Sequence, residues 1–554
     1  MVDSFFFDRH CLQEVLTFLP GCERDFALGA WSAWIQFKES NTKTAMHTIW
    51  ILGDQLSPGH AAFAGHAPGT ARVLMIESKA RGSVLRYHQM KLVLIYSAMR
   101  HYAQELRKSG WEVDYYTLEQ GLTFEEGVRG HVRAHQPATI ALAEPNSFLE
   151  TVAIEKLGRK LKIEIRFVST TQFLLPRRDF HEWASGQRRI VMENHYRRMR
   201  KRFGWLMDAN GQPEGGAWNY DIENRATLRA WQRAGSPRAQ TPLRVSPDAI
   251  TREVIEMVER EFAENPGRAA DMWLPVDREG ALKWLELFIR DRLPNFGVYE
   301  DMMAEHEPIL FHSLLSPMLN LGLLEPRECV EAAIDAYRNG RAPLNSVEGF
   351  VRQILGWREF INGIYWYRGP GYRELNSLSA AQPLPKFFYT GDTDMNCLHH
   401  VLRQDLALGW NHHIQRLIVL GNFLLITGIN PQQALRWYSE MYVDAYDWVM
   451  APNVIGMSLY ADGGSMATKP YAATSSYIDK MSNYCKGCRF DPKQKTGSDA
   501  CPFNYLYWHF IDQHADRFSG NPRMRTIVSS WLKRSETNKE DVRVSARGFL
   551  SALT

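Results

Sequence analysis

The stretch Ile49-Trp50-Ile51-Leu52-Gly53-Asp54-Gln55 decides the fold of the N-terminal part, because a polar turn closes a run of four apolar residues. Similar apolar runs follow at 73–76, 140–143 and 163–168. Between them lies a helical pattern with apolar residues spaced by four and three: Leu92, Tyr96, Met99, Ala103 and Leu106. Strands that alternate with helices form βαβ units. We therefore expect an α/β domain with a doubly wound parallel sheet.

In such sheets, ligands bind at the carboxyl ends of the strands. Gly53, Asp54 and Gln55 follow the first expected strand, and Glu77 follows the second. These four residues are candidates for a ligand site at this edge of the sheet.

The strand pattern stops after residue 176. Residues 177–247 contain a basic stretch and then text rich in Pro and Gly, which is typical of an interdomain connector. From 248 to 554 amphipathic helical patterns predominate, so we expect an all-helical domain there. The predicted organisation is an extension of unknown function at 1–45, an α/β domain at 46–176, the connector, and the helical domain.

The composition excludes several classes of protein. A chain of 554 residues with 45% hydrophobic and 23% charged residues can bury large cores, which argues against disorder and against an integral membrane protein. The formal net charge of only +3 means that any contact with nucleic acid depends on a local basic patch.

The cysteines favour a reducing compartment. There are seven, an odd number that suits a secreted disulfide framework poorly. Asp3 and Asp8 stand where a signal peptide needs basic residues, and the longest apolar run, 417–429, is too short to span a membrane. We expect a cytoplasmic protein with no membrane contact.

Three cysteines are clustered at Cys485, Cys488 and Cys501, and Cys397 is the natural fourth member. Four thiolates suit a tetrahedral zinc ion or an iron–sulfur cluster, and spacing alone does not separate the two. The alternative is a set of unrelated buried thiols. Cys11, Cys22 and Cys329 lack this clustering, so we interpret them as structural or incidental.

Two further patterns each allow two interpretations. His412-His413-x-x-Arg416 falls in a helical pattern, and it fits either an acid/base pair beside an anion clamp or two histidines inside a core. The pairs Arg188-Arg189 and Arg197-Arg198 lie among aromatic residues, and they fit either a nucleic-acid backbone or a solvated helix face. Trp437, Tyr438 and Tyr389, taken alone, indicate core rather than a redox relay.

Several motifs in one order resemble the photolyase/cryptochrome superfamily, and more narrowly the iron–sulfur bacterial cryptochromes and prokaryotic (6-4) photolyases. The resemblance covers about residues 46–535. It rests on His312 to Pro317, Arg352 to Glu359, His412-His413-x-x-Arg416, Asp444 to Gly456, the four cysteines, and Ile51 to Pro58.

The resemblance implies an N-terminal antenna domain and a helical domain that binds FAD. Residues implied to hold the phosphates of FAD are Ser313, Leu314, Leu315 and Ser316. Those implied to line the rest of the cofactor are Gln353, Trp357, Arg358, Arg416, Asp444 and Asn453. Cys397, Cys485, Cys488 and Cys501 match the ligands of a 4Fe-4S cluster, which moves the preference from zinc to the cluster.

The implied activity is light-driven repair of (6-4) pyrimidine–pyrimidone lesions by a (6-4) DNA photolyase. An excited, fully reduced FAD supplies an electron, and a proton must then reach the lesion. By resemblance, His413 is the general acid, His412 supports it, and Tyr471 borders the lesion pocket. The implied partner is UV-damaged DNA, gripped by Arg188, Arg189, Arg197 and Arg198, and the expected state is a monomer.

Two departures from the family pattern bear on function. Many relatives have Trp where this chain has Tyr389, so a photoreduction relay through Trp437 and Tyr438 would end in a residue that is harder to oxidise. Arg81 stands where relatives that bind the antenna 6,7-dimethyl-8-ribityllumazine have an acidic residue, although Gly53, Asp54, Gln55 and Glu77 remain. The alternative function is a blue-light photoreceptor cryptochrome without repair. Repair of cyclobutane dimers is disfavoured, because those enzymes usually carry Asn at the position of His413.

Overall fold

The computed structural model describes residues 46–239 and 244–553, so the predicted extension at 1–45, with Cys11 and Cys22, lies outside the described residues. The chain divides into two compact units. One holds residues up to 84 together with 99–170, and the other holds 85–98 and 171–554. The chain passes between the units at three places, and one of them, after residue 98, falls within helix α4 (Gln89–Lys108).

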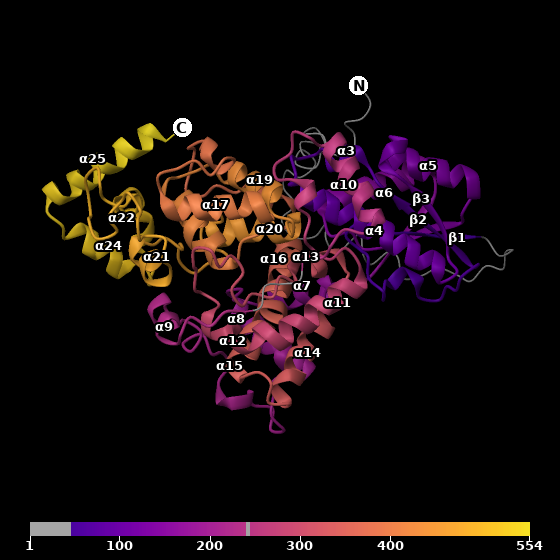
Figure 1. The fold of residues 1–554 in the computed structure, drawn as a ribbon, viewed down its shortest axis with the longest axis horizontal. Coiled ribbons are helices and arrows are strands. Elements are labelled where there is room, and N and C mark those ends of the chain that lie inside the picture. The colour runs from indigo at the N-terminus through magenta and orange to yellow at the C-terminus, as the bar shows by residue number, and fades with distance from the viewer. Residues whose placement is uncertain (1–45, 240–243, 554) are drawn as a thin grey trace. The chain divides into compact units, whose positions relative to one another are not determined.

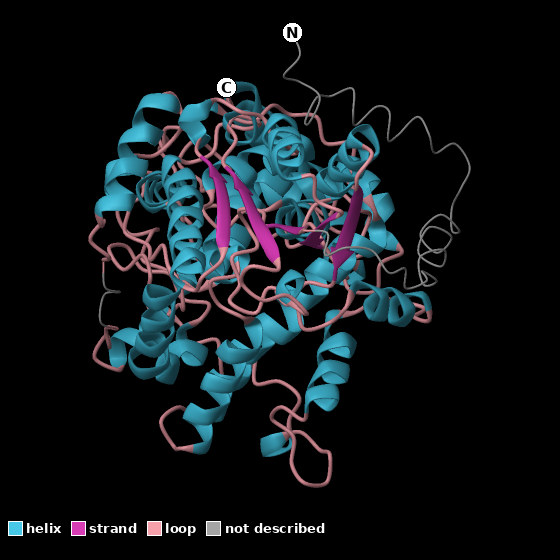
Figure 2. Ribbon diagram, turned by 90° about the vertical axis from the view of Figure 1, so that its right-hand side faces the viewer, coloured by secondary structure: helices cyan, strands magenta, loops and turns pink. Residues whose placement is uncertain are grey.

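The first unit contains a parallel sheet, as the sequence predicts (Figures 1 and 2), and its five strands follow the order β3-β2-β1-β4-β5. Its strands are β1 (His47–Trp50), β2 (Ala71–Ile76), β3 (Glu112–Tyr116), β4 (Thr139–Ala143) and β5 (Glu164–Val168). The helices that connect them include α3 (Lys79–Gly82), α5 (Phe124–His135) and α6 (Phe148–Leu161). The order reverses between β1 and β4, which is where open α/β sheets bind their ligands.

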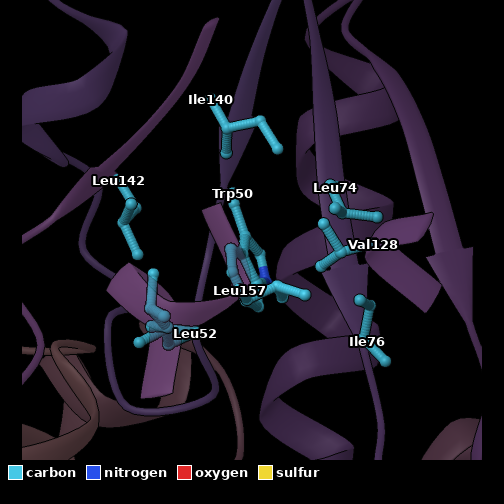
Figure 3. Packing of buried hydrophobic residues seen from close by; sticks show 9 residues of the cluster. Trp50, Leu52, Leu74, Ile76, Val128, Ile140, Leu142 and Leu157 are labelled. Atoms are coloured by element: carbon cyan, nitrogen blue, oxygen red, sulfur yellow. The ribbon is translucent and has the colours of Figure 1, made fainter. Parts of the chain in front are cut away.

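The core of this unit lies between the sheet and helices α5 and α6. Trp50 of β1 is 1% exposed and packs with apolar side chains of β2, β4, α5 and α6 (Figure 3). The inner strands β2 and β4 read as nearly continuous apolar runs, because burial on both faces removes the usual alternation of polar and apolar residues. The helix α5 begins with a capping box in which Thr123 and Glu126 satisfy each other's backbone amides.

The second unit is helical, which confirms the predicted fold class. Its α-helices are α7 (Arg177–Ser185), α8 (Met192–Phe203), α9 (Leu228–Arg233), α10 (Ala249–Glu261), α11 (Arg278–Leu287), α12 (Leu293–Tyr299), α13 (Ser316–Leu321), α14 (Pro326–Arg338), α15 (Leu344–Val351), α16 (Glu359–Arg368), α17 (Asn396–Leu408), α18 (Asn422–Ile426), α19 (Pro431–Met441), α20 (Asp447–Ala451), α21 (Ser475–Met481), α22 (Pro502–Gln513), α23 (Ala515–Ser519), α24 (Arg525–Leu532) and α25 (Glu536–Ala552) (Figure 1). Among the described residues, the structure contains no helix whose length and apolar character would let it cross a membrane.

The described residues of the predicted connector, 177–239 and 244–247, belong to the helical unit in the structure. They form α7, α8 and α9, and Phe180, Tyr196 and Met199 are at most 2% exposed. The connector was predicted from the charged, Pro and Gly residues of this stretch. The apolar residues between the charged ones pack α7 and α8 against the core of the helical unit.

Four segments of this unit are π-helical turns: η5 (Phe288–Arg292), η6 (Arg352–Arg358), η9 (Gln415–Gly421) and η10 (Pro452–Ser458). π-Helical turns are rare in proteins, but those that occur are often found at functional sites. At Gly421 in η9, a Cβ atom would lie 2.1 Å from the Ser458 Oγ of η10. Only glycine therefore permits this close approach of the two turns.

Candidate functional site

A cavity of about 420 Å³ lies within the helical unit. Segments far apart in the sequence line it, including α13, η6, η9, α20 and η10. Most of the predicted FAD and lesion residues meet there: Ser313, Leu314, Ser316, Gln353, Trp357, Arg358, His412, His413, Arg416, Tyr438, Asp444, Asn453 and Tyr471. Leu315 does not line the cavity; it is 1% exposed in the core, where it precedes α13.

A buried ion pair forms part of the wall. Arg416 donates from Nη1 to Asp444 Oδ1 at 2.9 Å and from Nη2 to Oδ2 at 3.1 Å. Burial acts to lower the pKa of Arg416, but Asp444 outweighs it, so the pKa rises above the usual value. Ser316 Oγ also donates to Asp444 Oδ2, at 2.7 Å. The pair is therefore held charged and fixed against the start of α13.

The π-helical turns supply polar side chains to the same wall. In η6, Arg358 donates from Nη1 to the carbonyl of Gln172 at 2.7 Å, while its Nε has no hydrogen-bond partner within the described part of the chain. Burial lowers the pKa of Arg358 to about 10. In η10, Asn453 Nδ2 donates to the carbonyl of Val449 at 2.8 Å. The π-helical turns η6 and η10 thus both contribute polar side chains to the wall of the cavity.

Three histidines meet at one side of the cavity. The rings of His312 and His412 stack with centroids 4.4 Å apart, and burial lowers the pKa of both well below the usual value. Neither ring nitrogen of His412 has a hydrogen-bond partner among the described residues. His413 is different, because 44% of its side chain is exposed and its Nε2 lies 3.5 Å from Asp301 Oδ1. His413 is therefore the most accessible member of the trio to a molecule that enters the cavity.

The three aromatic relay candidates differ in their burial. Tyr438 lines the cavity, and its ring lies edge-on to Trp437 with centroids 5.0 Å apart. Trp437 is fully buried and contacts Phe388 edge-on at 5.1 Å. Tyr389, which follows Phe388 in the sequence, is 38% exposed and donates its hydroxyl proton to Glu440 Oε2 at 2.8 Å.

The four clustered cysteines come from three places: the start of α17, the loop after α21, and the residue before α22. All are free thiols, and burial together with the charges of Cys501, Cys485 and Cys488 raises the pKa of Cys397 well above its usual value. Among the described residues, no three of these sulfur atoms lie within 4.8 Å of one another. A single tetrahedral zinc with bonds of about 2.3 Å needs sulfur–sulfur distances of roughly 3.8 Å, which no three of these atoms have in the described part of the chain.

The predicted phosphate-binding arginines do not line the cavity. Arg188 and Arg189 are exposed in the loop between α7 and α8, and Arg197 and Arg198 are half-buried on α8. Arg197 Nε is paired with Glu193 Oε1 at 2.7 Å. Of the five predicted DNA-binding residues, only Tyr471 reaches the cavity.

In the α/β unit, the residues predicted for an antenna differ in their availability. Gln55 Nε2 donates to the carbonyls of Ala143 and Glu144, across the point where the strand order reverses. Burial and the charge of Glu150 raise the pKa of Asp54 to about 7. Glu77 already accepts hydrogen bonds from Arg100, Tyr115 and the amide of Leu118. Arg81 donates from Nε and Nη2 to Glu150 at 3.1 Å.

Sequence reasoning missed several residues of the site. Asp301 faces His413, and Tyr442 lies under Arg416 with the guanidinium carbon 3.9 Å from the ring centroid. The backbone carbonyl of Asn411 accepts a hydrogen bond from Arg416 Nε at 2.8 Å. Only Asn411, directly before the two histidines, could have been found from its neighbours in the sequence.

Comparison with known proteins identifies relatives along most of the chain. The family model described as deoxyribodipyrimidine photo-lyase-related protein matches residues 49–274. A (6-4) photolyase of Agrobacterium fabrum is 42% identical over 508 residues, which cover 91% of this chain and 99% of that protein. An uncharacterized protein of Acanthamoeba polyphaga mimivirus is 38% identical over 114 residues, 21% of this chain and 84% of that protein.

A similar fold is found in the crystal structure of a bacterial class III photolyase from Agrobacterium tumefaciens. The structural match covers 91% of this chain and 92% of the chain in that crystal structure, with a TM-score of 0.52 and 18% sequence identity. The long match to the Agrobacterium fabrum protein, together with a cavity that gathers the motif residues, leads to one assignment: the chain belongs to the prokaryotic (6-4) photolyase family of the photolyase/cryptochrome superfamily.

Proposed function

We propose that this protein repairs (6-4) pyrimidine–pyrimidone photoproducts in DNA in a light-dependent reaction, as a (6-4) DNA photolyase. The observation that carries the proposal is the single cavity that joins the Arg416–Asp444 pair, the histidines and Tyr471. The name of the Agrobacterium fabrum relative supports the same lesion class.

The residues of the cavity fit FAD. Its volume lies within the usual range of about 300–1,000 Å³ for cofactor and ligand pockets. Buried polar atoms without protein partners line it, among them His412 Nδ1 and Nε2 and Arg358 Nε, and buried polar groups normally have partners. Ser313, Leu314 and Ser316 would hold the phosphates, while Gln353, Trp357, Arg358, Arg416, Asp444 and Asn453 would line the rest. When bound and fully reduced, FAD supplies the photoexcited electron for repair.

His413 is the proposed general acid. Asp301 Oδ1 faces its Nε2 and holds the ring, so a doubly protonated imidazole has Nδ1–H left to donate to the lesion. His412 stays neutral, because its burial disfavours the charged form, and it supports the ring of His413 from the side. Proton transfer from a positioned side chain typically contributes about 10²–10⁴-fold to rate.

The partner is UV-damaged DNA. A lesion base must leave the stack to reach the cavity, and a damaged, poorly paired site lowers the free energy required. Tyr471, at the cavity and half-buried, is placed to contact that base. Arg188 and Arg189 are exposed and would bind phosphates, with Arg197 and Arg198 beside them. We propose a monomer acting in the cytoplasm, where the free thiols would stay reduced.

Two further groups belong to the proposal. Cys397, Cys485, Cys488 and Cys501 would hold a structural 4Fe-4S cluster, which suits four thiols spaced more widely than a zinc site. An antenna such as 6,7-dimethyl-8-ribityllumazine would lie at the carboxyl ends of β1 and β4, near Gly53, Asp54 and Gln55. Glu77 is less suited to that ligand, because protein groups already occupy its carboxylate. Residues 46–176 are thus the proposed antenna domain, and 248–554 the proposed catalytic domain.

The proposal is tested with His413→Ala and a matched control, His399→Ala. His399 lies on α17, where its Nδ1 donates to the carbonyl of Gly391, and it does not line the cavity. Both variants should retain flavin, and only His413→Ala should lose repair of an oligonucleotide with one (6-4) thymine pair. Repair by His413→Ala at the rate of the control would remove the general-acid assignment.

A further inference from the structure

A second cluster of ligand-type side chains lies in the α/β unit, on elements that contribute nothing to the FAD cavity. His131 and His135 are four residues apart on α5 and therefore share one face. Asp114 of β3 lies opposite, with Oδ2 2.7 Å from His131 Nδ1 and 2.8 Å from His135 Nε2. The three ligand atoms all lie within 4.8 Å of one another.

The charges around this cluster favour a cation. Arg72 donates from Nη1 to Asp114 Oδ1 at 2.9 Å, on the side away from the histidine contacts, and its Nη2 donates to Glu112. Two carboxylates therefore face one guanidinium, which leaves a net charge of −1 when the histidines are neutral.

The protonation states suit a metal as well. Burial lowers the pKa of His131 below its usual value, which keeps the imidazole neutral. Burial acts to raise the pKa of Asp114, but hydrogen bonds from Arg72 and His131 outweigh it and lower the pKa. Neutral imidazole and ionised carboxylate are the forms that bind metals.

A supporting contact orients one of the histidines. His131 Nε2 lies 2.7 Å from Thr48 Oγ1 of β1, and both side chains are buried. Metal-binding histidines almost always have such a partner on the second ring nitrogen, which fixes the ring. The other side is open, since 24% of the His135 side chain and 18% of the Asp114 side chain are exposed. A metal ion and a water ligand can enter there.

We propose that Asp114, His131 and His135 form a zinc site, with water as the fourth ligand. Zinc bonds of about 2.0–2.2 Å to nitrogen and oxygen need ligand edges of roughly 3.3 Å. The edges from Asp114 Oδ2 to His131 and to His135 are shorter, at 2.7 Å and 2.8 Å, so Asp114 and the exposed His135 both have to shift by about half an ångström. The site would fix β3, an edge strand without a buried residue, to α5. The competing account is a plain hydrogen-bond network in which both neutral histidines donate to Asp114.

The test measures zinc bound to the whole flavin-containing protein, by equilibrium dialysis against Zn²⁺ after treatment with a chelator. The variant is His135→Gln, and the matched control is His66→Gln, a half-buried histidine that stacks near His47 in the same unit. Zinc can also enter the cysteines and the cavity histidines, so the readout is the difference between variants. We expect one equivalent less in His135→Gln and no change in His66→Gln.

Thermal melting provides the second readout. Zinc should raise the melting temperature of the wild type and leave that of His135→Gln unchanged, and in the presence of chelator the two should melt alike. If His135→Gln is unstable in chelator, Asp114→Asn replaces it in both measurements. Thr48→Val should weaken zinc binding by about 10- to 100-fold. Equal zinc content in the wild type and in the variants would overturn the proposal.

Discussion

Asp444→Asn perturbs the cavity at the ion pair with Arg416. The substitution removes the charge that compensates a buried guanidinium, while one amide oxygen can still accept a hydrogen bond. Breaking a buried pair from one side typically lowers the free energy of unfolding by about 3–5 kcal/mol, and the retained acceptor places this case near 3 kcal/mol. With an unfolding entropy of roughly 2.1 cal/mol/K per residue over a helical unit of roughly 400 residues, the melting temperature falls by roughly 4 °C.

The assay for this prediction is thermal unfolding followed by circular dichroism, with fluorescence of released flavin recorded in parallel. Glu182→Gln is the matched control, because it breaks an ion pair of similar length to Arg178 on the exposed face of α7. It should leave the melting temperature unchanged. The double variant Arg416→Gln/Asp444→Asn should recover part of the loss, since no unpaired charge remains buried. A variant Asp444→Asn that melts with the wild type and keeps its flavin would refute the reasoning.

Three further predictions concern other parts of the helical unit. His195 is fully buried among three aromatic rings, neither ring nitrogen has a partner, and burial lowers its pKa to about 3. The folded protein keeps this ring neutral, whereas the unfolded chain takes up a proton below its pKa of 6.5. The free energy of unfolding therefore does not depend on His195 protonation above pH 6.5, and it decreases as the pH falls from 6.5 towards 3. His195→Phe should therefore raise the free energy of unfolding by about 1–3 kcal/mol at pH 7 and reduce the dependence on pH in urea titrations; an unchanged slope would contradict this. Tyr389→Trp should speed photoreduction of the flavin in blue light and Tyr389→Phe should slow it, followed by absorbance; equal rates would exclude Tyr389 from the relay. Cys485→Ser should lower the content of iron and acid-labile sulfide, and a wild type that contains zinc alone would contradict the cluster.

The strand pattern could be predicted where the sequence carries several aliphatic or aromatic residues in a run or alternation, and it failed where acidic residues interrupt them. The apolar runs at β1, β2, β4 and β5 were visible in the sequence, with ends shifted by one or two residues. Strands β3 and β5 are both edge strands without a buried residue. Strand β5 was found because Ile165, Phe167 and Val168 mark it, whereas β3, Glu112-Val113-Asp114-Tyr115-Tyr116, has a single aliphatic residue between two acidic ones.

The residue types of the cavity could be predicted from motifs, but their partners could not. Arg416 and Asp444 are both in the motifs, and their bidentate contact depends on how η9 and α20 fold together. Asp301 lies more than a hundred residues from His413 and carries no periodic signal. Leu315 was grouped with its neighbours in the motif; its side chain packs in the core, and a contact of its backbone amide with a phosphate stays a prediction.

The central claim is light-driven repair of a (6-4) lesion, and its most direct measurement is product analysis of an oligonucleotide that carries one (6-4) thymine pair. The protein is reduced anaerobically, its reduced flavin is confirmed by absorbance, and samples are kept in blue light or in the dark. The account predicts restored thymines in the light sample alone. An unchanged lesion in the light, with the flavin reduced, would contradict it and favour a photoreceptor without repair activity.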